Sequence, residues 1–522
     1  MDRDVGCGEL RIEQEGNRVK LAGWVHRRRD HGGIIFLDLR DRTGLVQVVI
    51  NLEQLQETRT TIEGIRNEWV LRVEGEVVPR PSGTVNSNLP TGNIEVDADT
   101  VTILNQSKTP PFYINEESPV DESLRLRHRY LYLRRQHMYE NLVLRHNVVK
   151  FIRDFLSLKG FLEIETPTLI KSTPEGARDY LVPSRTSPGQ FYALPQSPQQ
   201  LKQLLMVAGF EKYFQIARCF RDEDMRADRQ NEFTQLDLEM SFVDTDDVLE
   251  LIEALYTEMI ETLMPQKSLL KPFPRLSHAE AMDRFGTDKP DLRFKVELSE
   301  VTDIVRMSQF KVFADVVANG GIIKGLAAPG CSYYTRKEID QLTEIARSSG
   351  AHGLVTFALD NEFQQIDGLT LENVRSPVTK FFNVEEVREI AVRTKANPGD
   401  LILLIAGETK LVNRTLDVLR REVGRQLSLA DPNMFAFAFV VDFPLFEWDD
   451  EQKRWDSSHH PFTAPWEEDI PLLDTEPGKI RSHAYDLVCN QHELGSGSIR
   501  IHQRGLQEKI FEVLGYTREE TE

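Results

Sequence analysis

The residues best suited to chemistry lie between Tyr213 and Phe242. Tyr213–Arg221 has the character of a strand, and Thr234–Phe242 alternates polar and apolar residues. Four polar residues share one face of the second segment: Gln235, Asp237, Glu239 and Ser241. The charged stretch Asp224–Asn231 would join the two segments as a loop. Two antiparallel strands would then present an arginine and several carboxylates on one surface. A sheet with one face on a core and one in water gives the same alternation, and the pattern alone favours that simpler interpretation.

The identities of these residues carry more information than their pattern. Three blocks follow one another here: Phe220-Arg221-Asp222-Glu223, Arg226-Ala227-Asp228-Arg229-Gln230 and Phe233-Thr234-Gln235-Leu236-Asp237. Together they resemble motif 2 of the class II aminoacyl-tRNA synthetases, in their bacterial aspartyl type. Other segments resemble the same family, and the first of them is similar to its motif 1: Gly160–Pro167, Thr173–Tyr180, Gln196–Gln199, His459–Phe462 and Gly497–His502. The resemblance covers essentially all 522 residues, and matches of this length and order are specific.

The resemblance implies an adenylyl transfer followed by an acyl transfer. The α-carboxylate of aspartate attacks the α-phosphate of ATP, which gives aspartyl-adenylate and pyrophosphate. The terminal ribose 3′-hydroxyl of tRNA-Asp then takes the aspartyl group. Neither step requires a covalent enzyme intermediate, so positioning and charge stabilisation are expected to carry the rate.

The same resemblance assigns the nucleotide site. Its expected ATP-binding residues are Arg221, Asp222, Glu223, Gln230, Phe233 and Glu493. Arg221 would be the catalytic residue and clamp the α-phosphate, because a guanidinium fork fits phosphate oxygens. Glu223 would accept from the adenine amino group, and Phe233 would stack on the ring. Asp486 and Glu493 would hold Mg²⁺, which prefers carboxylates together with phosphate oxygens.

The aspartate site needs a cationic hole and an anionic rim. The residues that match it are Glu175, Ser197, Gln199, Lys202, Arg221, Asp237, His459 and Arg500. Arg500 and Lys202 would pair with the substrate side chain, and Asp237 would orient Lys202. The first three residues of the set would hold the ammonium group, and His459 would close over the substrate. For any one isolated charge, an ordinary surface ion pair is the simpler explanation.

Recognition of tRNA is expected on the N-terminal barrel. The positions that match the family's anticodon contacts are Arg29, Phe36, Gln47 and Glu95. An exposed aromatic side chain stacks a splayed base, and arginine and amide groups read base edges. Core packing is the alternative for Phe36. His31 and Gly83 match the family members that tolerate the third anticodon base, which predicts that tRNA-Asn is also charged.

Five segments would position these residues. Within 1–106, short Val- and Ile-rich stretches suit either a small Greek-key barrel such as the OB-fold or another small all-β sandwich: Val19–Val25, Ile34–Leu39, Leu45–Ile50, Trp69–Val78 and Asn93–Leu104. The resemblance implies the OB-fold β-barrel. Residues 107–137 are expected to form a linker with prolines, and 138–287 the first part of an α/β catalytic domain built on an antiparallel sheet. Residues 288–428 are predicted to be an inserted α+β domain, and 429–522 the second part of the catalytic domain.

Composition bounds the class of protein. The net charge of −20 speaks against non-specific binding to polyanions, although local basic patches remain compatible with RNA. The charged N-terminus is unlike a secretory signal, and the sequence contains no apolar run of the length that a membrane helix needs. Four cysteines without a CxxC pair argue against a disulfide framework and a zinc site. The expected location is therefore the cytoplasm, and motif 1, with Pro167 as its interface proline, implies a homodimer.

The resemblance departs from the family at the end of the chain. Motif 3, whose arginine grips the γ-phosphate, would follow residue 522. A capping-box signature at Thr517 and Glu520 also opens a helix that has no body. Either the sequence is a fragment or it is a catalytically inactive tRNA-binding relative, and the intact ligand positions favour the fragment. A sibling ligase for asparagine or lysine is a third alternative, which the pair Lys202 and Arg500 disfavours.

Overall fold

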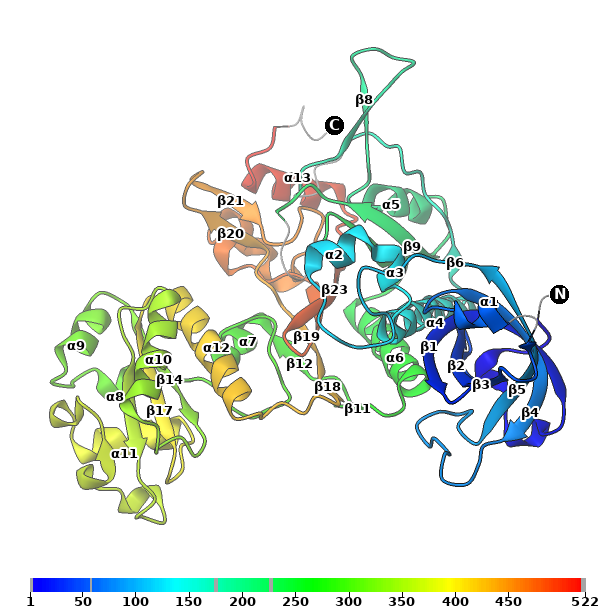
Figure 1. Ribbon diagram of the computed structural model, residues 1–522. Coiled ribbons are helices and arrows are strands. Elements are labelled where there is room, and N and C mark those ends of the chain that lie inside the picture. The colour runs from blue at the N-terminus through cyan, green and yellow to red at the C-terminus, as the bar shows by residue number, and fades with distance from the viewer. Residues whose placement is uncertain (1–2, 57–58, 173–176, 225–228, 518–522) are drawn as a thin grey trace. The chain divides into compact units, whose positions relative to one another are not determined.

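The computed structural model describes residues 3–56, 59–172, 177–224 and 229–517, which divide into two compact units (Figure 1). The first unit, Met1–Asn147, contains a closed barrel with strand order β1-β2-β3-β5-β4. Its strands are β1 (Arg18–His31), β2 (Ile34–Asp41), β3 (Gly44–Asn51), β4 (Val70–Pro79) and β5 (Ile94–Asn105). Alternate residues of β2 point inward, and Ile35, Leu37 and Leu39 are fully buried. The predicted OB-fold barrel is confirmed.

The chain that follows the barrel is anchored to it. The short helices here are α1 (Arg59–Glu63), α2 (Glu122–Arg127) and α3 (Arg129–Tyr132), and α4 (Gln136–Leu158) begins after them. Glu68, which is buried in the barrel, accepts from Arg40 at 2.9 Å and from Arg134 at 2.7 Å. Arg135 donates to two backbone carbonyls of the linker. The expected linker 107–137 is therefore fixed to the barrel by buried charges.

The second unit, Val148–Glu522, contains the two sheets of the predicted catalytic domain. One has the order β10-β9-β6, and the other the order β12-β19-β22-β23. Their strands are β6 (Leu162–Glu163), β9 (Lys212–Phe220), β10 (Glu232–Met240), β12 (Arg275–Ser277), β19 (Phe437–Val441), β22 (Ala484–Cys489) and β23 (His492–Ser498). The long pairs, β9 with β10, β19 with β22 and β22 with β23, are antiparallel, as expected. Helices α5 (Gln199–Val207), α6 (Thr245–Leu263) and α7 (His278–Phe285) accompany them.

The inserted segment folds as a sheet covered on both faces. Its strand order is β13-β14-β17-β15-β16. The strands are β13 (Ser299–Glu300), β14 (Ile322–Ala328), β15 (Val355–Leu359), β16 (Val374–Arg375) and β17 (Leu401–Gly407). The helices are α8 (Thr302–Val305), α9 (Lys311–Ala318), α10 (Arg336–Ser348), α11 (Val384–Arg393) and α12 (Thr409–Gln426). One core contains α10 and α12, and a second contains α8, α9 and α11. This agrees with an α+β domain, while its boundaries stay a prediction.

The remaining elements are short. They are β7 (Leu181–Pro183), β8 (Phe191–Ala193), β11 (Ser268–Leu269), β18 (Met434–Phe435), β20 (Phe446–Asp449), β21 (Arg454–Ser457) and α13 (Arg504–Val513). The predicted helical stripe near the C-terminus forms α13, and Gly515 follows it with φ +82°. The predicted capping box reaches Glu520, which lies outside the described residues.

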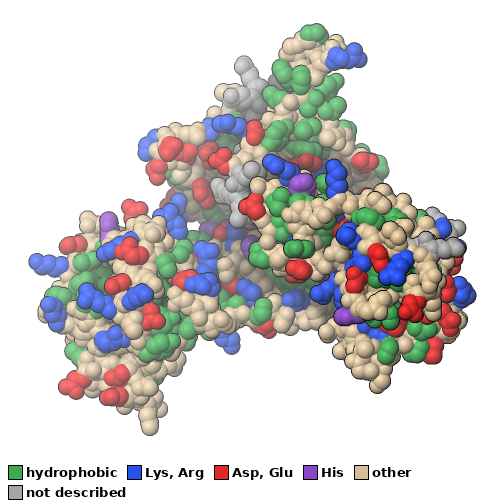
Figure 2. Space-filling view, viewed as in Figure 1, with side chains coloured by type: hydrophobic (Ala, Val, Ile, Leu, Met, Phe, Trp, Pro, Cys, Tyr) green, Lys and Arg blue, Asp and Glu red, His purple; other side chains and the backbone are tan. Residues whose placement is uncertain are grey.

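The surface and the core agree with the sequence composition. On the face drawn in Figure 2, basic side chains lie among acidic ones over both units, so the net charge of −20 does not form one acidic surface there. All four cysteines are buried thiols. Within the described part of the chain, no helix combines the length and the apolar character needed to cross a membrane.

Candidate active site

A buried cluster of charges joins β10 to α5. Lys202 on α5 lies 2.8 Å from a carboxylate oxygen of Asp237 and 3.2 Å from one of Glu239. The strand places these groups together because its apolar residues, among them Leu236 and Leu238, pack on the opposite face against a hydrophobic core. The predicted alternation of β10 is therefore confirmed, and the polar face of this strand contacts helix α5 rather than water.

Burial shapes the electrostatics of this cluster. Desolvation raises the pKa of the Asp237 carboxyl group, and the Lys202 ammonium group opposes that rise. Two carboxylates surround one ammonium group, so a second cation is needed to balance the charge. Arg500 supplies it, because its guanidinium nitrogen Nε lies 3.9 Å from Glu239.

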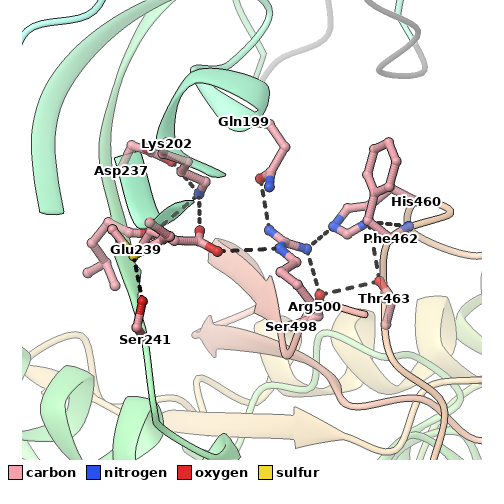
Figure 3. A network of polar contacts seen from close by, with 12 residues as sticks. Gln199, Lys202, Asp237, Glu239, Ser241, His460, Phe462, Thr463, Ser498 and Arg500 are labelled. Carbon is pink, nitrogen blue, oxygen red and sulfur yellow. Dashed lines mark hydrogen bonds and ion pairs between the residues drawn. The ribbon is translucent and has the colours of Figure 1, made fainter. Parts of the chain in front are cut away.

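Arg500 is held in place by polar groups from three segments (Figure 3). It donates to the side-chain oxygen of Gln199 at 2.9 Å and to the hydroxyl of Ser498 at 2.6 Å, and it also contacts the ring of His460. Among the described residues, neither Nε of Arg500 nor Nε2 of Gln199 has a hydrogen-bond partner, although both are buried. Two buried donors without acceptors fit a site that an anionic or carbonyl group of a ligand completes.

The two adjacent histidines have different surroundings. Burial and the nearby Arg500 guanidinium lower the pKa of His460 to about 3, so its ring is neutral at neutral pH. His459 lies elsewhere, with Nε2 at 3.5 Å from Asp486 and its ring against Phe443. The sequence singled out His459 for the substrate, whereas His460 is the histidine that contacts Arg500. The role predicted for His459 stays a prediction.

Most of the residues predicted for the nucleotide line one cavity of about 310 Å³. The described lining residues are Arg221, Glu223, Asp224, Arg229, Gln230, Asn231, Phe233, Lys289, Gln491 and Glu493. The Arg221 guanidinium lies over the ring of Phe233 at 5.2 Å, and its buried Nε has no hydrogen-bond partner in the described chain. An aromatic face beside a free guanidinium edge suits a base and a phosphate. Asp222 is exposed and is not among these residues.

The two carboxylates predicted for magnesium come from adjacent strands. Asp486 on β22 is buried, and one of its oxygens accepts no hydrogen bond from the described residues. Glu493 on β23 lines the nucleotide cavity. Burial opposes the charged form of Lys289, but Asp288 and then these two carboxylates raise the pKa of its ammonium group. No group of three metal-ligating side chains occurs in the described part of the chain, but magnesium in nucleotide sites is held by one or two carboxylates and the phosphates. The donor set therefore fits this ion.

The same strands carry both subsites. β10 bears Phe233 in the cavity and Asp237 four residues further along, which is about 13 Å at 3.3 Å per residue. On the other sheet, Glu493 lies in the cavity, and Arg500 follows just after the end of β23. Rigid strands thus connect the cavity to the buried cluster of charges around Lys202 and Arg500.

The barrel groups the residues predicted for the anticodon. Arg29 on β1 is paired with Phe36 on β2, and its guanidinium donates to Gln47 at 3.2 Å. Gln47 in turn donates to Glu95 at 2.6 Å. Phe36 is half-buried and lies on the outer face of β2, between inward-facing neighbours. The alternative in which Phe36 packs in the core is therefore wrong.

The other predicted residues have less informative surroundings. His31 packs edge-to-face on Phe36, with ring centroids 5.9 Å apart. Gly83 has φ +87°, and no atom lies within 4 Å of where a side chain would start. Ser197 accepts from the backbone of Gln199. Glu175 lies outside the described residues.

Sequence reasoning missed several residues of the site. They are Arg229, Glu239, Lys289, His460, Gln491 and Ser498. Glu239 had a usable signal, because it shares the polar face of β10 with Asp237. Arg229, His460, Gln491 and Ser498 lie within two residues of the predicted Gln230, His459, Glu493 and Arg500. Lys289 reaches the cavity through contacts between distant parts of the chain.

Comparisons with known proteins agree with this arrangement. A family model described as tRNA synthetases class II (D, K and N) matches residues 121–522, and one described as an OB-fold nucleic acid binding domain matches residues 19–104. An aspartate–tRNA(Asp/Asn) ligase of Dehalococcoides mccartyi strain CBDB1 is 57% identical over 511 residues, 98% of this chain and 86% of that protein. Its counterpart from Heliobacterium modesticaldum is 54% identical over 513 residues, 98% and 83% of the two chains. A solved asparaginyl-tRNA synthetase from Pyrococcus horikoshii, complexed with asparaginyl-adenylate, has a TM-score of 0.58 at 18% identity, and the match covers 100% of this chain and 88% of that one.

Proposed function

The chain belongs to the class II tRNA synthetases of the D, K and N group, and we propose that it uses ATP to attach L-aspartate to tRNA-Asp through aspartyl-adenylate. Its relatives at 51–57% identity are named aspartate–tRNA(Asp/Asn) ligases and match it over nearly its full length. No comparison supports a catalytically inactive relative.

One observation carries the choice of aspartate. Lys202 and Arg500 are both largely buried, and both have a nitrogen within 4 Å of Glu239, at 3.2 Å and 3.9 Å. Two cations in a desolvated hole favour a side chain with a full negative charge, since the energy of a charge pair grows as the dielectric falls. An asparagine amide would form no charge pair with either cation, and a lysine side chain would be repelled.

The cavity residues are proposed to position ATP for attack at its α-phosphate. Arg221 would donate to the α-phosphate oxygens while the ring of Phe233 supports the base. Positioning and charge stabilisation by such groups lower the barrier without a covalent intermediate. Asp486 and Glu493 would hold magnesium, which would neutralise charge on the phosphates.

The barrel is proposed to bind the anticodon of tRNA-Asp through Arg29, Phe36, Gln47 and Glu95. The exposed edge of Phe36 and the polar chain beside it suit a stacked base read at its edges. We extend the proposal to tRNA-Asn, since the relatives' names include it and the space around Gly83 is open. Charging assays with tRNA-Asp, tRNA-Asn and an unrelated tRNA test this extension. If tRNA-Asn is charged no better than the unrelated tRNA, the extension to tRNA-Asn is excluded.

A homodimer is proposed as the working form. Pro167 lies in a polar depression of about 440 Å³ together with Arg153 and Glu163, and exposed apolar side chains such as Leu158 and Leu162 lie on the elements beside it. Apolar residues exposed in this way mark interaction surfaces. The proposed location is the cytoplasm, where buried thiols stay reduced.

Aspartate-dependent exchange between ATP and pyrophosphate tests the central proposal. Asparagine and lysine serve as control substrates under the same conditions. We expect exchange with aspartate alone. Exchange with asparagine or lysine at a comparable rate would refute the assignment of the cationic hole.

A further inference from the structure

Lys289 lies in the nucleotide cavity, although it belongs to the start of the inserted segment. Its ammonium nitrogen is 2.6 Å from Asp288 and 3.4 Å from Glu493, and its side chain is 31% exposed. Glu493 is one of the two carboxylates expected to hold magnesium. The lysine therefore lies beside Glu493, where the phosphates are expected.

The backbone next to Lys289 is fixed by buried groups. Arg420 on α12 is fully buried and donates to the carbonyls of Asp291 at 2.7 Å and Val296 at 2.5 Å. The carboxylate of Asp291 accepts from Gln491, which also lines the cavity, at 2.9 Å. Pro290 restricts the chain between them. The ammonium group is thus delivered by a segment with little conformational freedom.

The charged side chains of the cavity indicate what Lys289 could bind. Its described lining contains three cationic and three anionic side chains. Arg229 lies near Glu223 at 3.7 Å and is half exposed, and Arg221 covers Phe233. Lys289 is the lining cation that contacts a predicted metal ligand. A triphosphate carries several negative charges, so a lysine at that place matches its β- and γ-phosphates, for which a compact ammonium charge is well suited.

We propose that Lys289 binds the β- and γ-phosphates of ATP and the pyrophosphate that leaves. The inference rests on the proposed function. In the first step a bond forms between the aspartate carboxylate oxygen and the α-phosphorus. The bond from that phosphorus to the bridging oxygen breaks, and its electron pair stays on pyrophosphate. The Lys289 ammonium group donates a hydrogen bond to the charge that develops there, and no proton is transferred.

A purely structural ion pair is the competing explanation, and the choice of ligand separates the two. The test compares Lys289→Met and Lys289→Arg with Lys295→Met, which removes an exposed lysine six residues away. Calorimetry measures the Kd of pyrophosphate, of α,β-methylene-ATP and of AMP, which lacks both outer phosphates. A hydrogen bond to a charged group contributes about 1.5–3 kcal/mol, so Lys289→Met should weaken the first two ligands roughly 10- to 150-fold.

The other outcomes are equally defined. AMP binding should change less than about twofold in Lys289→Met, Lys289→Arg should restore most of the pyrophosphate affinity, and Lys295→Met should behave like the wild-type chain. Unchanged pyrophosphate affinity in Lys289→Met, or an equal loss for AMP, would overturn the proposal. Exchange by the wild-type chain tests the ligase proposal separately, because the binding measurements need no turnover.

Discussion

Replacing Arg500 by leucine removes a guanidinium group from the centre of the proposed aspartate site. Arg500 donates to Gln199 and Ser498, and it shares Glu239 with Lys202. If it forms a two-pronged pair with the substrate carboxylate, two charge-assisted hydrogen bonds are lost. At about 1.5–3 kcal/mol each, this amounts to about 3–6 kcal/mol. The expected fall in kcat/KM for aspartate is roughly 10²- to 10⁴-fold.

The assay is aspartate-dependent ATP–pyrophosphate exchange, with the KM of ATP determined in parallel. Arg504→Leu is a matched control, because Arg504 lies four residues away, is 87% exposed and pairs only locally with Glu508. We expect the control to retain the wild-type rate. An Arg500→Leu chain that activates aspartate as fast as the control would refute the assignment. An equal loss of ATP affinity would indicate a general distortion of the site instead.

Three further predictions concern tRNA binding, acid stability and the buried ion pairs. Phe36→Ala should weaken binding of tRNA-Asp in filter assays roughly 5- to 150-fold, because stacking one base contributes about 1–3 kcal/mol, and unchanged affinity would contradict the anticodon role. The pKa of His460 is about 3 in the fold and 6.5 as its ordinary value, so the unfolded chain binds the extra proton between these values. The free energy of unfolding is highest above pH 6.5 and falls by about 2 kcal/mol by pH 5 for this reason. Urea unfolding of His460→Gln should show a weaker loss of stability in acid, and an equal loss would exclude His460 as its cause. Lys202→Met leaves Asp237 and Glu239 without their ammonium partner and should lower the free energy of unfolding by about 3–5 kcal/mol; a loss below about 1 kcal/mol would show that the pair is not desolvated.

The parts of the fold that depend on local pattern were predictable. The barrel strands and β10 follow from alternation, because a strand with one buried face must place every second side chain inward. The stripe before Gly515 likewise predicted α13. These predictions needed no knowledge of which segments meet.

The parts of the site that depend on distant contacts were not predictable from pattern. Arg500 and Gln199 are 301 residues apart in the chain, and no periodicity relates them. Pattern also cannot tell which of His459 and His460 contacts Arg500, for a related reason. Both lie in a loop outside any helix or strand, so no regular period determines which of the two rings faces Arg500.

Lys289 shows why the inserted segment and the catalytic domain must be considered together. The sequence of the inserted segment contains no catalytic motif, so no functional role was predicted for its first residues. Yet an insertion must leave and rejoin the catalytic unit, and here one connection lies in the cavity while the other leads into a strand next to the site. The outgoing one places Lys289 in the cavity. The returning one leads through β18 into β19, which pairs with the strand that carries Asp486. Because buried Arg420 on α12 ties the inserted domain to the outgoing connection, the packing of that domain helps to fix the position of a cavity cation.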